Sequence, residues 1–363
     1  MKKIIIIGVA LVVFLSIWYF GFLGQSQPAD QEVVQLQTKD FVKFGSWQEQ
    51  QQKIADENLA QKAEEVKENG FTLIAVGDVM LSRMVGQKMV EYNDYHYPFL
   101  KVQDFLQSSD ITFGNLESPI IAGQPVVTGS FVFRADPEVA ESLDWAGFDV
   151  MTLANNHSLN KGSAGLQSTF DYLKKYFIDY VGAAKNYDEL ANQLVVKEVN
   201  GYKVGFLGYS YGAEYDEADS DPGIALMKES QLVGDIQRAR PQVDFLIVTM
   251  HDGVEYNHVS GVHQQKFAHL AIDQGADLVI GHHPHVVQEV EKYKDKYIFY
   301  SLGNFVFDQM WSIDTRQGLA VKLRINYQGV QEVEYYPVII GDYAQPRPAN
   351  EVESELILDY LQL

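Results

Sequence analysis

Short apolar runs alternate with amphipathic segments from Phe71 onward, and this texture is typical of an α/β fold. Each run has the length of a buried strand and is bounded by glycine or polar residues. The strands predicted in this way cover residues 71–76, 111–113, 149–153, 203–207, 245–249, 277–280 and 297–300.

Helices are predicted between these strands. One begins at Asp136-Pro137, because a capping residue is followed there by the proline that favours the first helical turn. Another covers residues 163–176, and a third covers 262–274 and ends at Gly275.

Strict alternation of apolar and polar residues near the end of the chain predicts a different element. Residues 319–326 alternate with period two, which indicates a half-buried strand. Gln328-Gly329 then leads into a second strand at 333–340. We expect these two strands to form an antiparallel hairpin added to the α/β body.

The N-terminus predicts a membrane anchor. Lys2 and Lys3 precede an apolar run over residues 4–23, and about 20 such residues in a helix span a bilayer. The lysines favour a cytoplasmic N-terminus, which places the rest of the chain outside the cell membrane as a single-pass protein. A cleaved signal peptide is the alternative, but the run is longer than a usual signal core and lacks a small-x-small cleavage site.

The anchor at residues 1–24 is followed by a polar spacer at 25–70. Its part from Ser46 to Asn69 is rich in Gln, Glu, Lys and Ala, which predicts a solvated stalk helix. The main domain is predicted over 71–345, with a C-terminal extension at 346–363.

The amino-acid composition excludes several kinds of site and argues against one class of partner. The chain of 363 residues has no cysteine, which excludes disulfides, zinc–cysteine sites and a thiol nucleophile. Its formal net charge of −21 repels phosphate backbones and argues against nucleic acid as a partner. A polyanionic substrate would need a locally positive spot, which a bound metal ion can provide.

Polar side chains that ligate metals follow several of the predicted strands. Ligands of open α/β sheets bind outside the carboxyl ends of the strands, so we expect these side chains to gather at one edge. They are Asp78, Asn115, Glu117, Asn156, His157, His251, Asp252, His282, His283, His285 and Asn304. A mixed nitrogen and oxygen set without sulfur fits one or two divalent ions, with Mn, Zn and Fe preferred.

Each of these clusters also has a plain structural interpretation. Gly77-Asp78 fits a turn after a strand, Asn155-Asn156 fits a helix cap, and His251 fits a structural histidine. His283-Pro284-His285 is harder to explain in this way, because alternate residues of an extended chain share a face, as chelation requires. The set as a whole favours a metal site.

The motifs, in their order along the chain, resemble those of the CapA/PgsA family of capsule synthesis proteins. The resemblance covers about residues 71–340 and rests on Gly-Asp-Val-Met, Asn-Leu-Glu-Ser, Ala-Asn-Asn-His, His-x-Gly-x-Glu-Tyr, Gly-His-His-Pro-His-Val-Val-Gln and Tyr-Ser-Leu-Gly-Asn-Phe-Val-Phe-Asp. That family is associated with making, exporting or anchoring poly-γ-glutamate and is related to calcineurin-like metallophosphoesterases. The resemblance therefore implies a four-layer α/β/β/α sandwich with a dinuclear metal site.

The resemblance also implies roles for individual residues. Metal ligands would be Asp78, Asn156, His251, His283 and His285, with Glu117 near the position of a bridging carboxylate. His157 would contact substrate or protonate the leaving group. Further candidates in the same motifs are Asn115, Asp252, Glu255, His282 and Asn304.

Two residues depart from the pattern of the related enzymes. Met80 stands where the phosphoesterase Asp-x-His motif has its histidine, and Asp252 replaces the tryptophan of the family's usual His-Trp-Gly. With the histidine absent, either one metal loses a ligand or Glu117 compensates for it. Asp252 either adds an oxygen ligand or faces solvent.

Three functions remain open from the sequence. The first is a membrane-anchored phosphoesterase-like hydrolase of capsule synthesis or export, with an anionic polymer such as poly-γ-glutamate and membrane-bound synthase subunits as partners. The second is a non-catalytic accessory subunit with a structural or vestigial metal site, which Met80 favours. The third is a secreted metallophosphoesterase unrelated to capsule.

Overall fold

The computed structural model describes residues 52–53, 56, 70–126, 129–213 and 216–362. The predicted membrane helix at 4–23 and nearly all of the predicted stalk helix lie outside these residues. Among the helices that are described, none has the length and apolar character needed to span a bilayer. The unit from Gln61 to Leu363 carries the elements discussed below.

The first sheet is built around four parallel strands. β1 (Phe71–Val79), β2 (Ile111–Leu116), β3 (Val150–Thr152) and β4 (Asp179–Val181) lie side by side in chain order. Short β13 (Asn304–Val306) pairs in parallel with the end of β1.

Antiparallel strands extend this sheet on the other side of β1. β14 (Gln317–Asn326) pairs with β1, β15 (Gly329–Gly341) pairs with β14, and β16 (Gln345–Pro348) forms the edge. The predicted antiparallel hairpin at the end of the chain is thereby confirmed.

The second sheet also has a parallel centre flanked by antiparallel strands. β7 (Tyr202–Ser210), β9 (Phe245–His251), β10 (Leu278–His282) and β12 (Lys296–Phe299) are parallel, with β6 (Val195–Val199) and β11 (Val290–Tyr293) as antiparallel edges. A separate pair joins β5 (Ala183–Ala184) to β8 (Gly223–Ile224). The mixed α/β fold predicted from the sequence is confirmed, and it contains two sheets.

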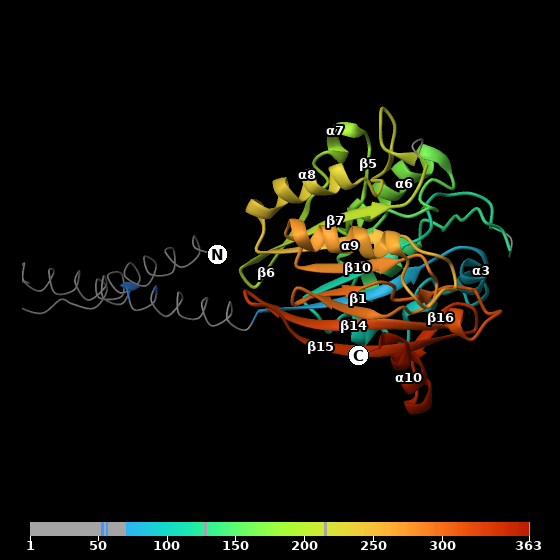
Figure 1. Cartoon of the computed structure of the whole chain (residues 1–363). Helices are drawn as coiled ribbons and strands as arrows, with labels where there is room; N and C mark the ends of the chain where they lie inside the picture. The colour runs from blue at the N-terminus through green and yellow to red at the C-terminus, as the bar shows by residue number, and fades with distance from the viewer. Residues whose placement is uncertain (1–51, 54–55, 57–69, 127–128, 214–215, 363) are drawn as a thin grey trace, which may run out of the picture. The chain divides into compact units, whose positions relative to one another are not determined.

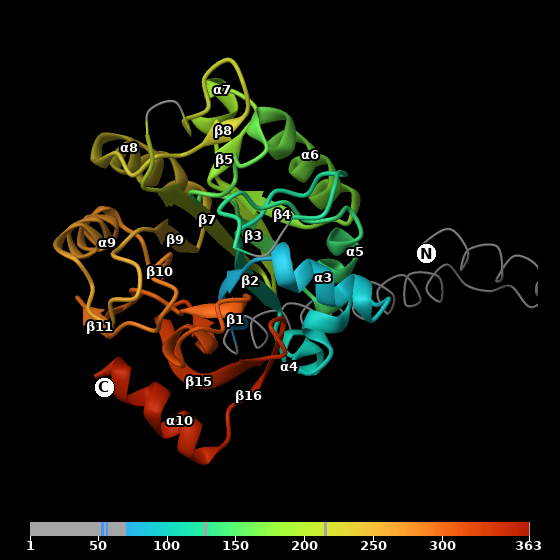
Figure 2. The same cartoon turned by 90° about the vertical axis from the view of Figure 1, so that its right-hand side faces the viewer.

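The two sheets bury one apolar cluster between them and carry helices on their outer faces (Figures 1 and 2). Phe113 of β2 stacks on Phe206 of β7 in this central cluster, with ring centroids 5.8 Å apart. The outer face of the first sheet packs against α3 (Arg83–Glu91), α5 (Val139–Ala146) and α6 (Gly162–Lys175). That of the second sheet packs against α8 (Glu229–Ala239) and α9 (Val262–Gln274).

The C-terminal residues pack on the same body. After β16, helix α10 (Glu351–Leu358) begins at a capping box made by Asn350 and Glu353. Ile357 and Leu361 are buried in the central cluster. Further short helices in the described part of the chain are α4 (Gln103–Leu106), α7 (Tyr187–Leu190) and single 3₁₀ turns at Tyr97–Phe99, Arg240–Gln242, Asp314–Arg316 and Asp359–Leu361.

Two glycines let backbones approach closely just before predicted ligands. A Cβ at Gly77 would lie 2.0 Å from the carbonyl oxygen of Gly303, and one at Gly281 would lie 2.0 Å from that of Tyr300. Neither contact is with a flexible side chain, so the backbone itself would have to move. The Gly-Asp and Gly-His pairs therefore position Asp78 and His282 through close packing of neighbouring chains.

Gly77→Ala is expected to lower the free energy of unfolding by about 2 kcal/mol or more, because the added methyl group meets backbone. Gly86→Ala is the control, since its nearest contact would be 3.7 Å and alanine favours the helix that contains it. Urea unfolding of the two variants measures the difference. Equal stability of the two would contradict the close-approach explanation.

Candidate metal centre

Three buried side chains from different strands converge at the carboxyl ends of the sheets. Asp78 ends β1, Glu117 follows β2, and His251 ends β9. One ligand atom of each lies within 4.8 Å of the others, and all three side chains are completely buried. This is the largest concentration of metal-ligating chemistry that we identify among the described residues.

Asn115 of β2 ties this group together. Its Nδ2 donates to Asp78 Oδ1 at 2.8 Å and to Glu117 Oε2 at 3.1 Å, and lies 3.4 Å from His251 Nδ1. Its Oδ1 accepts from Asn155 Nδ2 at 3.0 Å, which fixes the orientation of the amide. The two carboxyl groups are thus joined by one shared neutral donor.

The loop after β10 brings further histidines to Asp78. His282 Nδ1 lies 3.3 Å from Asp78 Oδ1, and His285 Nδ1 lies 3.3 Å from Asp78 Oδ2. His285 Nδ1 also lies 3.0 Å from the oxygen of Asn304, whose amide donates to Gln309 and to the Thr315 carbonyl. These two donated hydrogen bonds fix the Asn304 amide so that its oxygen faces the His285 ring. Because an amide oxygen only accepts, His285 carries its proton on Nδ1, and Nε2 is left free as a ligand atom.

Several polar atoms of this group are buried and have no hydrogen bond. They are Asp78 Oδ2, Glu117 Oε1, both ring nitrogens of His282, and His283 Nδ1. Unsatisfied buried polar atoms are rare, since each one costs free energy. Here they lie beside one another and combine carboxylate oxygens with imidazole nitrogens, which is the donor set of a divalent transition metal site. The residues present therefore fit such an ion.

Asn156 and His157 approach from the loop after β3. Asn156 Oδ1 lies 3.0 Å from His251 Nε2. His157 Nδ1 lies 2.9 Å from Asn160 Oδ1, which also accepts the backbone N–H of Phe133. Because Asn160 Oδ1 accepts a hydrogen bond from a backbone N–H, it must be the amide oxygen, and His157 therefore donates to it from Nδ1. His157 Nε2 then carries no proton and is an acceptor that lies 3.8 Å from Glu117 Oε1.

The backbone of the histidine loop is strained. His283 has φ 101° and His285 has φ 59°, in the left-handed region that side chains with a Cβ rarely adopt. Both side chains are buried, and the rings of His251 and His283 lie 4.9 Å apart. Strain of this kind persists where surrounding contacts impose it and is concentrated at functional sites.

Burial and neighbouring charges shift the protonation of the group. Burial, with the charges of Asp78 and Glu255, raises the pKa of Glu117 well above its usual value. Burial alone would raise the pKa of Asp78, but the imidazoles of His282 and His285 next to its two oxygens hold it well below its usual value. Burial lowers the pKa of His157 to about 4 and that of His283 to about 3, and lowers the pKa of His251 strongly. These three histidines are therefore neutral at neutral pH, as ligation requires.

Comparison with known proteins places the chain in a family. Residues 72–309 match the family model described as bacterial capsule synthesis protein PGA_cap. The chain belongs to this family. It is 33% identical over 290 residues to the capsule biosynthesis protein CapA of Bacillus anthracis, covering 77% of this chain and 70% of the relative. It is 30% identical over 280 residues to the PGA biosynthesis protein CapA of Bacillus subtilis (strain 168), covering 76% and 73%.

Among solved structures, a hypothetical protein from Thermus thermophilus superposes with a TM-score of 0.46 at 15% identity, covering 73% of this chain and 98% of that chain. Agreement at this level adds nothing to the family assignment.

The structure shows what Met80 and Asp252, the two residues that depart from the phosphoesterase pattern, contact. Met80 is fully buried in the apolar cluster beneath α3, and its sulfur accepts the backbone N–H of Ser82 at 3.1 Å. Asp252 Oδ2 lies 2.6 Å from His263 Nδ1, within hydrogen-bond distance. Glu255 is exposed but close enough for its charge to act on Glu117.

Four residues near the centre were not singled out from the sequence. Asn160 orients His157, and Tyr211 places its ring centroid 4.7 Å from that of His283. Arg83 forms an ion pair with Asp308, and its charge acts on both Glu117 and His157. Asp308 ends the last quoted motif, so its position was visible, whereas no pattern in the sequence marks the other three.

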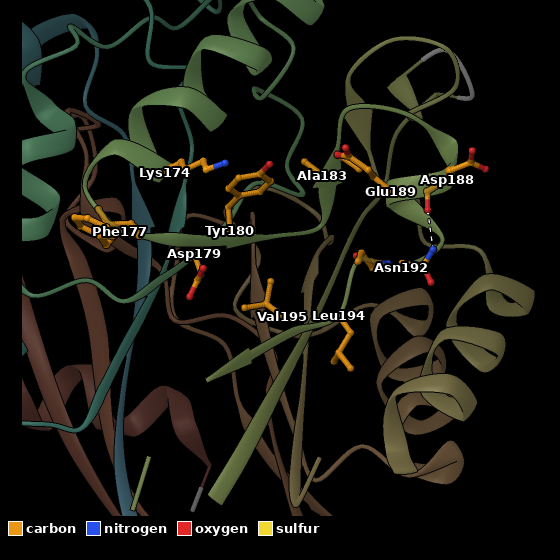
Figure 3. Close-up of a pocket in the computed structure, with 13 residues that line it drawn as sticks. Lys174, Phe177, Asp179, Tyr180, Ala183, Asp188, Glu189, Asn192, Leu194 and Val195 are labelled. Carbon is orange, nitrogen blue, oxygen red and sulfur yellow. Dashed lines mark hydrogen bonds between the residues drawn. The ribbon is translucent and has the colours of Figure 1, made fainter. Parts of the chain in front are cut away.

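A large cavity in the described part of the chain lies elsewhere. It has a volume of about 810 Å³ and is lined by β4, α7 and the start of β6, with Tyr180 and Val195 among its walls (Figure 3). It contains none of the predicted site residues. The metal-ligating group is instead packed tightly in the interior, which suits a small ion better than a large organic ligand.

The metal-free protein is expected to lose stability as the pH falls from 7 to 4. His157 and His283 protonate in the unfolded chain near pH 6.5 but stay neutral in the folded protein down to about pH 4 and 3, so acid favours unfolding. Each of these two histidines lowers the free energy of unfolding by roughly 1.4 kcal/mol per pH unit below 6.5. Glu117 partly offsets this loss, because its raised pKa has the opposite effect on stability. Urea unfolding in chelator measures this, and His283→Gln should reduce the slope. An unchanged slope in that variant would contradict the assignment.

Proposed function

We propose that this chain is a membrane-anchored, extracytoplasmic protein of poly-γ-glutamate capsule synthesis or export that carries a divalent metal centre with phosphoesterase-like hydrolytic activity. The buried convergence of Asp78, Glu117 and His251 is the observation that carries this proposal. Family membership and the CapA relatives support the capsule role over a phosphoesterase unrelated to capsule.

The arrangement of layers fits the proposal. Helices on the outer faces of two packed sheets correspond to the four-layer α/β/β/α sandwich expected of a metallophosphoesterase relative. The candidate ligands stand at the carboxyl ends of β1, β2, β9 and β10, where such folds bind ligands. One or two ions are compatible with this donor set, and Mn, Zn and Fe suit its nitrogen and oxygen atoms.

We assign roles to the side chains as follows. Asp78, Glu117 and His251 would hold an ion, with His283, His285 and Asn156 beside them as further ligands. A divalent ion in this position supplies a Lewis acid and lowers the pKa of a water molecule. His157 presents a neutral Nε2 toward the group, fixed by Asn160, and from there it accepts or returns a proton at the reacting oxygen.

Met80 supports a second candidate function. Its side chain belongs to the apolar core, so β1 offers one ligand where an ordinary phosphoesterase offers two. A weaker centre of this kind would serve a non-catalytic subunit that binds polymer or synthase. Bound metal without turnover would favour this candidate.

Asp78→Asn is expected to lower metal content of the purified full-length protein at least about tenfold and to abolish hydrolysis of a chromogenic phosphodiester. The control is Asp273→Asn, an exposed aspartate paired with Lys294 on the surface. Elemental analysis and assays across Mn, Zn, Fe and Mg measure both effects. Absence of metal and turnover from the unmodified protein would rule out the hydrolase proposal.

Deletion of residues 2–24 is expected to move the protein from the membrane pellet to the soluble fraction, because the apolar run at 4–23 supplies the anchor. Fractionation followed by mass determination of the intact membrane form checks this. A membrane form already lacking the first 24 residues would show that the segment is a cleaved signal.

A further inference from the structure

Arg83 lies beside the metal-ligating group without belonging to it. It is the first residue of α3, and its guanidinium carbon lies 4.6 Å from the ring centroid of Phe133 and 5.5 Å from that of Phe307. The Phe133 ring in turn stacks on His157, with centroids 3.9 Å apart. The positive charge of Arg83 acts on Glu117, which places it within electrostatic reach of the centre.

The guanidinium has more donors than the protein uses. Nη1 donates to the Ser130 carbonyl at 3.1 Å and Nη2 donates to Asp308, while buried Nε has no partner. A guanidinium carries five N–H groups, so donors remain available although the side chain is only 9% exposed. Buried donors without acceptors are costly, and a bound anion would satisfy them.

The backbone of Arg83 is held in an unfavourable conformation by contacts with its surroundings. Its φ of 49° is left-handed, which is unfavourable for a residue with a Cβ. Asp308 holds the strained turn by accepting from the backbone N–H of Met84 at 3.1 Å as well as pairing with the guanidinium. The turn therefore fixes a cation next to the centre at a cost in backbone energy.

Arg83 also lines a cavity of about 330 Å³ on the α3 side of the site. The other charged residues that line this cavity are Arg134, Asp136 and Glu91. Arg134 is paired with Asp136 at 2.7 Å. The remaining walls, which include Leu81, Val90 and Pro125, are mostly apolar.

We propose that Arg83 binds a carboxylate or phosphate group of the anionic substrate next to the metal centre. This rests on the proposed function and deepens it. An anion approaching a protein of net charge −21 is repelled, and the exposed carboxylate of Glu255, whose charge acts on Glu117, adds to this repulsion near the centre. Arg83 supplies planar, paired donors that match a carboxylate or phosphate, which a metal ion alone does not.

The test measures binding of a γ-glutamyl oligomer and of inorganic phosphate to the full-length protein by calorimetry. Arg83→Gln should weaken binding of the recognised anion roughly tenfold or more, because a charge-assisted hydrogen bond is lost. Arg83→Lys should bind with intermediate affinity. Asp308→Asn keeps the acceptor for Met84 but removes the competing charge, so binding should tighten by roughly twofold to fivefold.

The double variant Arg83→Gln with Asp308→Asn guards against misfolding, since it leaves no unpaired buried carboxylate. Arg324→Gln is the matched control, because its pair with Glu332 is exposed and far along β14. Loss of oligomer binding alone assigns a carboxylate, and loss of phosphate binding alone assigns a phosphate. Undiminished binding of both in folded Arg83→Gln, or loss of metal from it, would overturn the proposal. Because these readouts do not need turnover, they hold even where hydrolysis is absent.

Discussion

The site depends on burying two carboxyl groups side by side in the protein interior. Asp78 and Glu117 are fully buried, and one oxygen of each has no hydrogen bond. Two such charges in a medium of low polarity repel each other and lose hydration, so a compensating group is required. Asn115 supplies neutral donors to both, and the histidines of the β10 loop supply the rest. A divalent ion held by Asp78, Glu117 and His251 would complete this compensation.

The sequence allowed much of the fold to be predicted because its signals were local. The strongly apolar strands β1, β9 and β10 and helix α9, with its left-handed Gly275, lie close to their predicted bounds. Strand β6 was not predicted, and helix α8 was covered only by the general prediction of helices between the strands, without bounds. β6 is a half-exposed edge of mixed composition, and α8 begins at Glu229 after Lys228, which provides no capping side chain, so neither carries a clear local pattern.

The residues of the candidate site likewise divide into those that could be predicted from the sequence and those that could not. Residues directly after strands, such as Asp78 and His251, were found because the carboxyl ends of parallel strands share one edge. Arg83 and Asn160 act through tertiary contacts with Asp308 and Phe133, which lie far from them in the chain or in another loop. No periodicity or spacing records such contacts. Tyr211 is hidden for the same reason, since only the packing of β7 against β9 brings it to His283.

Met80 determines how the centre must work if it binds metal. With the methionine side chain in the apolar core, more of the ligation would fall on Glu117, the carboxyl group whose pKa is raised by burial and by the charge of Asp78. Metal and proton therefore compete for the same oxygen, whereas neutral His251 and His283 bind without first losing a proton. Occupancy of the centre would then depend on pH and would fall where Glu117 takes up its proton.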